Sequence, residues 1–365
     1  MKLSSFTQGR DNNFNLIRML AALSVLVSHS YALTTGISDA QPFARTLGMT
    51  LGTIAVDIFF ITSGFLVTAS LLNRQSTLEF IMARILRIYP ALLIVLLLTV
   101  FGLGVYFTRL PLQQYLTDHT TYAYLRRGLT LITGVSLSLP GVFENTPLKG
   151  EVNSSLWTLP FEIRMYSILA IAWVILGLMK PARYRVFEIL VVMSAVLTGA
   201  AVLLMHIGNQ HANVFYELYF MFFTGASFYV LRDRIHLTYA IFIPLVLALL
   251  LAISHRQIFF VVYSLSIAYL LFFLAYVPSG FIRKYNRLGD YSYGIYIYAY
   301  PVQQSIEAMH PGISIARITI VSTLITLAFS VISWHYLERR ALGLKGITVF
   351  HARRILGKNP ATQKQ

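Results

Sequence analysis

Long apolar stretches follow one another along most of this chain, and short polar segments separate them. A helix of about 20 apolar residues spans the hydrocarbon core of a bilayer, since it rises 1.5 Å per residue. Stretches of roughly this length lie near residues 14–34, 51–72, 86–107, 156–178, 186–206, 213–231, 237–253, 257–277, 290–308 and 314–337. The pattern predicts an all-α, polytopic integral membrane protein with about ten transmembrane helices.

The composition agrees with this class. Of the 365 residues 56% are hydrophobic and 12% are charged, which leaves too little polar surface for a soluble globule. Cysteine is absent from the sequence, so disulfides, thiolate chemistry and cysteine-bound metals are excluded, and we expect no metal. The first apolar stretch follows a polar start and has no small-residue cleavage site, so we interpret it as an uncleaved signal anchor.

The net charge of +15 first suggests a nucleic-acid partner. However, most of the 29 basic residues lie in connections on one side of the predicted helices, together with both chain ends. The positive-inside rule therefore places both termini in the cytoplasm. A basic tail at 341–365 suits the anionic lipids of the inner leaflet, so we expect membrane lipids rather than nucleic acid as its partner.

One connection, at about 108–155, is much longer than the others and would lie on the outer side. A loop of this length usually has a function, and we expect it to cover an outward-facing site. The sequence contains no internal repeat and no separate soluble region. We therefore predict one membrane domain at 1–340, followed by the tail.

The first span carries two ionisable residues, Arg18 and His29. A charge near the middle of a spanning helix costs roughly 2.5 to 3.5 kcal/mol on insertion scales, so such residues usually mark a functional site. Eleven helical residues turn about 20° past three full turns, which puts both side chains on one face about 16 Å apart. The helix thus presents two stations at different depths.

At the outer station, Asp57 of the second predicted helix lies at a depth similar to that of His29. A carboxylate beside an imidazole fixes its tautomer and supports it as a general base, so these residues are candidate catalytic groups. Glu162, in Leu156-Trp-Thr-Leu-Pro-Phe-Glu162, is expected at comparable depth as a second acid/base or an acceptor-binding group. The alternative is that His29 and Asp57 make only structural hydrogen bonds.

At the inner station, Arg84 and Arg87 are three residues apart and project from one helical face, and Arg18 enters at the same depth. Guanidinium groups pair with phosphate bidentately, so the three arginines are candidate ligands of a phosphate-rich donor such as coenzyme A. The alternative is ordinary snorkelling of arginines toward the cytoplasmic surface.

Two further motifs leave their role open. Phe59-Phe-Ile-Thr-Ser-Gly-Phe65 contains small residues that favour close helix packing over direct substrate contact. The tyrosine-dense run Tyr291–Pro301 either lines a polar path or simply anchors its helix.

These motifs, in this order, resemble the acyltransferase-3 family of membrane acyltransferases. The resemblance rests on Arg18-x10-His29, Phe59–Phe65, Arg84-x-x-Arg87, Leu156-Trp-Thr-Leu-x-x-Glu162 and the closing Ser333–Glu338 segment. It implies transfer of an acyl group, commonly acetyl, from cytoplasmic acyl-CoA to a hydroxyl of a glycan or lipid-linked sugar. His29 matches the proposed catalytic histidine of the family, and Arg18, Arg84 and Arg87 match the arginines associated with the acyl-CoA donor.

The sequence therefore predicts an O-acetyltransferase of the bacterial inner membrane that uses acetyl-CoA as co-substrate. Its acceptor would be a cell-envelope polysaccharide such as lipopolysaccharide, or a lipid-linked precursor. Direct transfer and an acyl-enzyme relay both remain open at this point. The rival hypothesis is a secondary transporter or flippase for an anionic lipid-linked sugar, which predicts broken helices in two related halves.

Overall fold

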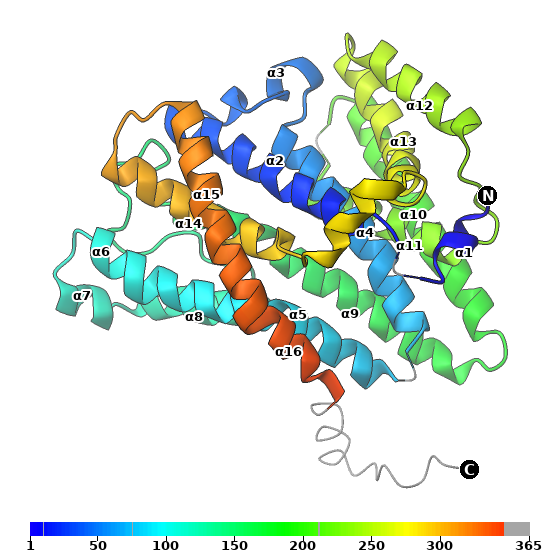
Figure 1. Cartoon of the computed structure of the whole chain (residues 1–365), viewed down its shortest axis with the longest axis horizontal. Helices are drawn as coiled ribbons and strands as arrows, with labels where there is room; N and C mark the ends of the chain where they lie inside the picture. Colours follow the sequence, from blue (N-terminus) through cyan, green and yellow to red (C-terminus); the bar gives the residue numbers. More distant parts are fainter. Residues whose placement is uncertain (10, 75, 211, 347–365) are drawn as a thin grey trace, which may run out of the picture.

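The computed structural model describes residues 1–9, 11–74, 76–210 and 212–346. Within these ranges the chain is helical, with isolated bridges and no strands (Figure 1). Most of the predicted basic tail, from residue 347 onward, lies outside the described residues.

Ten longer helices form the body of the part of the chain that the structure describes, and each overlaps one predicted stretch. They are α2 (Phe14–Thr35), α4 (Leu51–Leu72), α5 (Thr77–Leu97), α9 (Leu159–Ile175), α10 (Arg183–Ile207), α11 (Val214–Val230), α12 (Tyr239–Ala252), α13 (Arg256–Tyr276), α14 (Ser292–Met309) and α15 (Ile315–Ser333). The short helices are α1 (Leu3–Phe6), α3 (Ala44–Leu47), α6 (Val105–Phe107), α7 (Leu112–Thr117), α8 (His119–Thr130) and α16 (Arg339–Gly343).

Seven helical stretches among the described residues are long and apolar enough to cross a membrane, while α11 and α12 are shorter apolar helices. Several present large side chains outward, for example Leu197 and Leu204 of α10, which are 62% and 69% exposed. Such apolar surface requires a lipid environment. The protein is thus a multi-pass membrane protein, while the count of ten spans and the cytoplasmic termini stay predictions.

The third span begins earlier than its apolar pattern predicted. Ser76 caps α5 by accepting a hydrogen bond from the backbone N–H of Glu79, so the helix starts at Thr77. The helical path then continues through a π-helical segment at Leu98–Gly104 to Phe107. Arg84 and Arg87 consequently lie in the interior of α5 rather than at its start.

The helix α14 is the central element of the bundle. It packs against α2, α5 and α15, and almost every residue from Ser292 to Glu307 is buried. Tyr293, Tyr296, Tyr298 and Tyr300 are therefore buried in the protein interior and not at its surface. Full enclosure by other helices also explains why a helix this polar is tolerated.

The contact between α4 and α11 depends on two glycines. A Cβ on Gly64 would lie 1.9 Å from the carbonyl oxygen of Phe222, and one on Gly225 would lie 2.0 Å from that of Ile61. The backbones meet so closely that no side chain fits, which confirms the packing role expected for this part of the Phe59–Phe65 motif.

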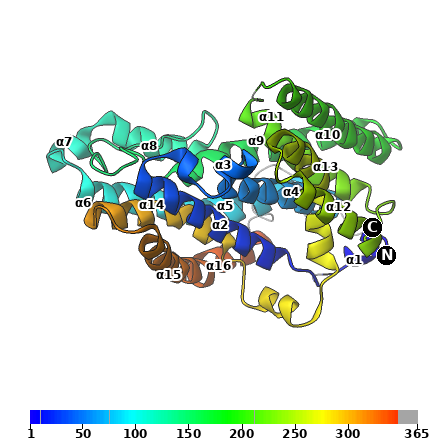
Figure 2. The ribbon, with the colours of Figure 1, turned by 90° about the horizontal axis from the view of Figure 1, so that it is seen from above.

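Both α2 and α14 end on the side of the molecule where α6, α7 and α8 lie, and we call this side the loop end (Figures 1 and 2). The predicted long loop is partly helical there, since it contains α7 and α8. The opposite side, where α5 begins and α16 ends, is the tail end (Figure 1).

Candidate active site

A cavity of about 80 Å³ brings the three predicted arginines together. Side chains from α2, α4, α5, α9 and α14 line it, and those that bear on its chemistry are Arg18, Ser63, Arg84, Arg87, Glu162 and Tyr166. We call it the arginine cavity.

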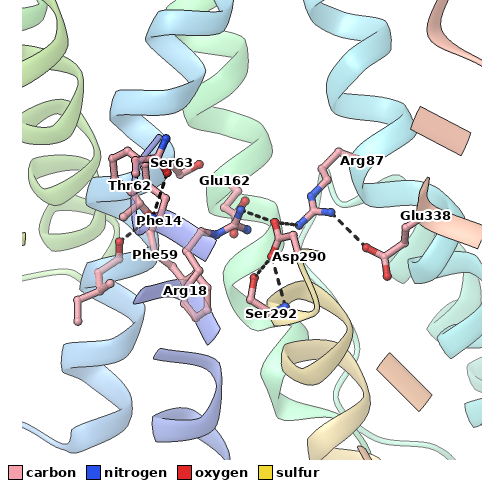
Figure 3. A network of polar contacts seen from close by, with 12 residues as sticks. Phe14, Arg18, Phe59, Thr62, Ser63, Arg87, Glu162, Asp290, Ser292 and Glu338 are labelled. Atoms are coloured by element: carbon pink, nitrogen blue, oxygen red, sulfur yellow. Dashed lines mark hydrogen bonds and ion pairs between the residues drawn. The ribbon is translucent and has the colours of Figure 1, made fainter. Parts of the chain in front are cut away.

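Two of these arginines are already neutralised within the protein. Asp290 Oδ2 lies 2.8 Å from Arg18 Nη1 and 2.5 Å from Arg87 Nη2, and Glu338 Oε2 lies 3.3 Å from Arg87 Nη1. The other carboxylate oxygen of Asp290 accepts a hydrogen bond from Ser292 Oγ at 2.5 Å. Figure 3 shows Asp290 between the two guanidinium groups, with Glu338 on the far side of Arg87. Sequence reasoning did not identify Asp290, because it lies 272 residues from Arg18.

Arg84 differs from its neighbours because it takes part in no ion pair in the part of the chain that the structure describes. Its Nε atom is buried and has no hydrogen-bond partner. A partly buried guanidinium that forms no ion pair with the described residues is costly, so it marks a place where an anionic ligand would gain from binding.

Glu162 was expected beside His29, at a comparable depth. It lies instead in the arginine cavity. The Tyr166 hydroxyl, one helical turn later in α9, donates to Glu162 Oε2 at 2.7 Å. Tyr166 has a single hydroxyl proton, so Ser63 must donate to the Tyr166 oxygen across their 2.7 Å contact. The chain from Ser63 through Tyr166 to Glu162 thus has a defined direction.

A second cavity, of about 300 Å³, contains His29 and Asp57. We call it the His29 cavity, and it lies nearer the loop end than the arginine cavity, as the spacing of Arg18 and His29 along α2 requires. Its lining is rich in polar groups and includes Gln41, Thr50, Thr53, Trp157 and Glu217.

The imidazole of His29 is held by a tyrosine and not by a carboxylate. The Tyr300 ring packs edge-on against it, with centroids 5.0 Å apart and planes at 81°. The Tyr300 hydroxyl donates to Glu151 Oε2, which also accepts from Ser154 Oγ at 2.5 Å. His29 Nδ1 itself is buried and has no hydrogen-bond partner in the described part of the chain.

The expected contact between Asp57 and His29 is not formed. Asp57 Oδ2 instead accepts a hydrogen bond from the Tyr263 hydroxyl of α13 at 2.9 Å. Both residues line one cavity, yet the Asp57 carboxylate is held by α13, whose position beside α4 the apolar pattern does not predict. Glu151, which precedes α9 in the long loop, is the carboxylate linked to His29 through Tyr300.

Val56 and Tyr296 line both cavities and so form a shared wall. The Tyr296 hydroxyl is 2.7 Å from Thr158 Oγ1, and its ring packs against Phe59 with centroids 5.5 Å apart. The two stations are therefore neighbouring chambers. Across the described ranges, no group of three or more His, Asp or Glu residues could hold a metal ion.

Comparison with known proteins identifies relatives along nearly the whole chain. A family model described as an acyltransferase domain matches residues 11–335. An O-acetyl transferase of Shigella phage Sf6 is 28% identical over 91% of this chain and 96% of its own length. Nodulation protein 10 of Rhizobium leguminosarum bv. viciae is 26% identical over 96% of this chain and 97% of its own.

No solved structure matches the chain at a comparable level of significance. The family match spans most of the sequence and includes the helices that line both cavities. The chain therefore belongs to the acyltransferase-3 family.

Proposed function

We propose that this protein is an O-acetyltransferase of a bacterial inner membrane. It would move the acetyl group of cytoplasmic acetyl-CoA to a hydroxyl of a cell-envelope polysaccharide or its lipid-linked precursor. The observation that carries this proposal is the pair of neighbouring cavities that share a wall of Val56 and Tyr296. One contains His29, and the other contains Arg84, which forms no ion pair with the described residues. The choice of acetyl as the transferred group is supported by the relative that is named an O-acetyl transferase.

The arginine cavity would bind the donor. Among the described residues Arg84 forms no ion pair, whereas Arg18 and Arg87 share Asp290 and Arg87 also pairs with Glu338. We therefore assign the strongest contact with a donor phosphate to Arg84. Arg18 and Arg87 would supply a weaker field, because their charges are largely balanced.

The His29 cavity would receive the acceptor hydroxyl. A ring nitrogen of His29 takes the hydroxyl proton, and the oxygen attacks the thioester carbonyl. The carbon–sulfur bond then breaks, the acetyl group stays on the acceptor oxygen, and the leaving thiolate takes up the proton. Tyr300, fixed by Glu151, would hold the imidazole in orientation during these steps.

A relay through His29 is the other order of events that this geometry permits. The acetyl group would first pass to a ring nitrogen with release of the thiol, and the acceptor oxygen would then remove it. Radiolabel that stays on the denatured protein after incubation with labelled acetyl-CoA alone would establish the relay. Its absence in an enzyme that turns over would establish direct transfer.

The proposed function is tested by acetyl transfer from labelled acetyl-CoA to the surface polysaccharide of the producing bacterium. His29→Ala should abolish transfer while acetyl-CoA still binds to the purified protein, because His29 lies beyond the shared wall. The matched control is His119→Ala, since His119 is 93% exposed on α8. Turnover retained by His29→Ala would remove this residue from the mechanism.

A further inference from the structure

A third cavity lies at the loop end, apart from the two chambers just described. It encloses about 300 Å³ between the segment 143–147, the end of α14 and the start of the long loop. We call it the Glu307 cavity, and its lining includes Phe107, Arg109, Phe143, Glu144, Glu307 and Gly312.

The carboxylate of Glu307 is only half satisfied. The side chain is 2% exposed, and Oε1 accepts a hydrogen bond from the backbone N–H of Gly312 at 3.2 Å. The other oxygen, Oε2, is buried and has no hydrogen-bond partner among the residues that the structure describes. A purely structural cap for the turn at Gly312 would explain the first oxygen but not the second. A buried acceptor left unpaired costs free energy, so Oε2 is suited to a ligand that donates a hydrogen bond.

The same cavity offers an aromatic surface. The rings of Phe107 and Phe143 pack with centroids 4.8 Å apart and planes at 44°. Phe143 adopts a positive φ of 55°, and its carbonyl is held by the backbone N–H of Gly150 and the hydroxyl of Thr146, each at 3.0 Å. Arg109 and Glu144 are half-exposed and 4.0 Å apart, so their polar groups remain open to a ligand.

These groups together match the chemistry of a sugar. A pyranose presents hydroxyl donors along its edges and an apolar C–H face, which fit a buried carboxylate oxygen and an aromatic surface respectively.

The position of the cavity relative to His29 follows from two helices. Asp290 contacts Arg18, Tyr300 contacts His29, and Gln303 Nε2 donates to Ser30 Oγ at 2.8 Å, so α14 runs parallel to α2. Glu307 lies seven residues beyond Tyr300. Seven residues correspond to a rise of about 10 Å toward the loop end.

The end of α2 independently gives the same distance along the bundle between His29 and the Glu307 cavity. Gly36, seven residues beyond His29, lies against Pro147, which lines the Glu307 cavity. The cavity is therefore about 10 Å farther along the bundle than the imidazole. This separation is similar to the length of a disaccharide.

We propose that the Glu307 cavity is a second saccharide subsite. It would bind one sugar of an oligosaccharide or polysaccharide acceptor, while another sugar of the same chain meets His29. This inference rests on the proposed function, because it assumes that the acceptor is a glycan. It adds that the enzyme recognises a length of glycan and not an isolated sugar.

Acetyl transfer to acceptors of two lengths tests this subsite. The acceptors are the oligosaccharide repeat released by mild acid from the surface polysaccharide of the producing bacterium, and the monosaccharides from its complete hydrolysis. Glu307→Gln keeps an oxygen for Gly312 but replaces the free acceptor oxygen with a donor. Loss of one hydrogen bond to a charged group should raise KM for the oligosaccharide about tenfold. The value of kcat, and any transfer to monosaccharides, should stay within about twofold.

Arg109→Ala should shift KM in the same direction. Its matched control is Arg126→Ala, because Arg126 is an exposed arginine of α8 outside the cavity lining. An unchanged KM for the oligosaccharide in Glu307→Gln would overturn the subsite. Equal effects on both acceptor lengths, or equal KM values of the wild type for both, would also overturn it.

Calorimetry with the same oligosaccharide and the detergent-purified full chain separates this inference from the proposed function. If the wild type binds the oligosaccharide, Glu307→Gln binds it more weakly and no acetyl transfer occurs, then the subsite stands and the proposed function fails. If acetyl transfer occurs but Glu307→Gln changes neither KM nor binding, the function stands and the subsite fails. Absence of both binding and transfer would overturn both.

Discussion

Single residues in this protein differ sharply in how well their charge is balanced. Arg87 has two carboxylate partners and Arg18 has one, whereas Arg84 has none among the described residues. All three arginines look equivalent in the sequence, since they share the same predicted depth. Their difference arises from Asp290 and Glu338, which approach from the other end of the chain. The fold thus leaves Arg84 as the arginine of this cavity that has no ion pair with the described residues.

Arg84→Ala should therefore weaken acetyl-CoA binding most. A charge-assisted contact contributes about 1.5 to 3 kcal/mol, so Kd measured by calorimetry should rise at least roughly tenfold. In the wild type, Kd should rise with ionic strength, because the contact is electrostatic, and this salt dependence should be smaller in the variant. Arg126→Ala on α8 is the control. An unchanged Kd in Arg84→Ala would favour the snorkelling interpretation of this residue.

At the scale of elements, hydrophobic patterning predicted each long helix to within a few residues, with α5 as the exception. The pattern succeeds because lipid forces apolar residues onto whole helices, and it fails at the start of α5 because the charged residues Glu79 and Arg84 interrupt the apolar run. Helix neighbours were harder to predict. The hydrogen bond from Tyr263 to Asp57 depends on α13 lying against α4, and periodicity carries no information about this packing.

The α4–α11 crossing gives an element-scale prediction. Gly64→Ala would place a Cβ 1.9 Å from the Phe222 carbonyl oxygen, so the helices must separate. Overpacking of this kind costs about 1 to 3 kcal/mol, and Tm in detergent should fall by several degrees. Gly102→Ala is the matched control, because a Cβ there meets nothing within 4 Å. Equal Tm values for the two variants would contradict the close crossing.

For the whole molecule, the site combines residues that no local motif joins. His29 was identified from its place in an apolar helix, but Tyr300 and Glu151, which surround it, come from the central helix and the long loop. Glu151 lies outside the predicted helices, so depth arguments could not reach it. Glu162 was placed at the wrong station because a helix start alone does not fix the depth of a side chain in a tilted bundle.

The sidedness of the molecule remains to be tested, and the natural lack of cysteine makes this direct. Gln8, near the N-terminus, and Gln113, on α7, are both exposed. If basic connections face the cytoplasm, a membrane-impermeant maleimide should label Gln113→Cys but not Gln8→Cys in intact spheroplasts. In permeabilised cells the maleimide should label both variants. The cysteine-free parent protein should stay unlabelled in intact spheroplasts and in permeabilised cells. Labelling of Gln8→Cys alone would invert the topology. The arginine cavity would then lie nearer the outer side, away from cytoplasmic acetyl-CoA, so this experiment also tests whether the donor can reach Arg84.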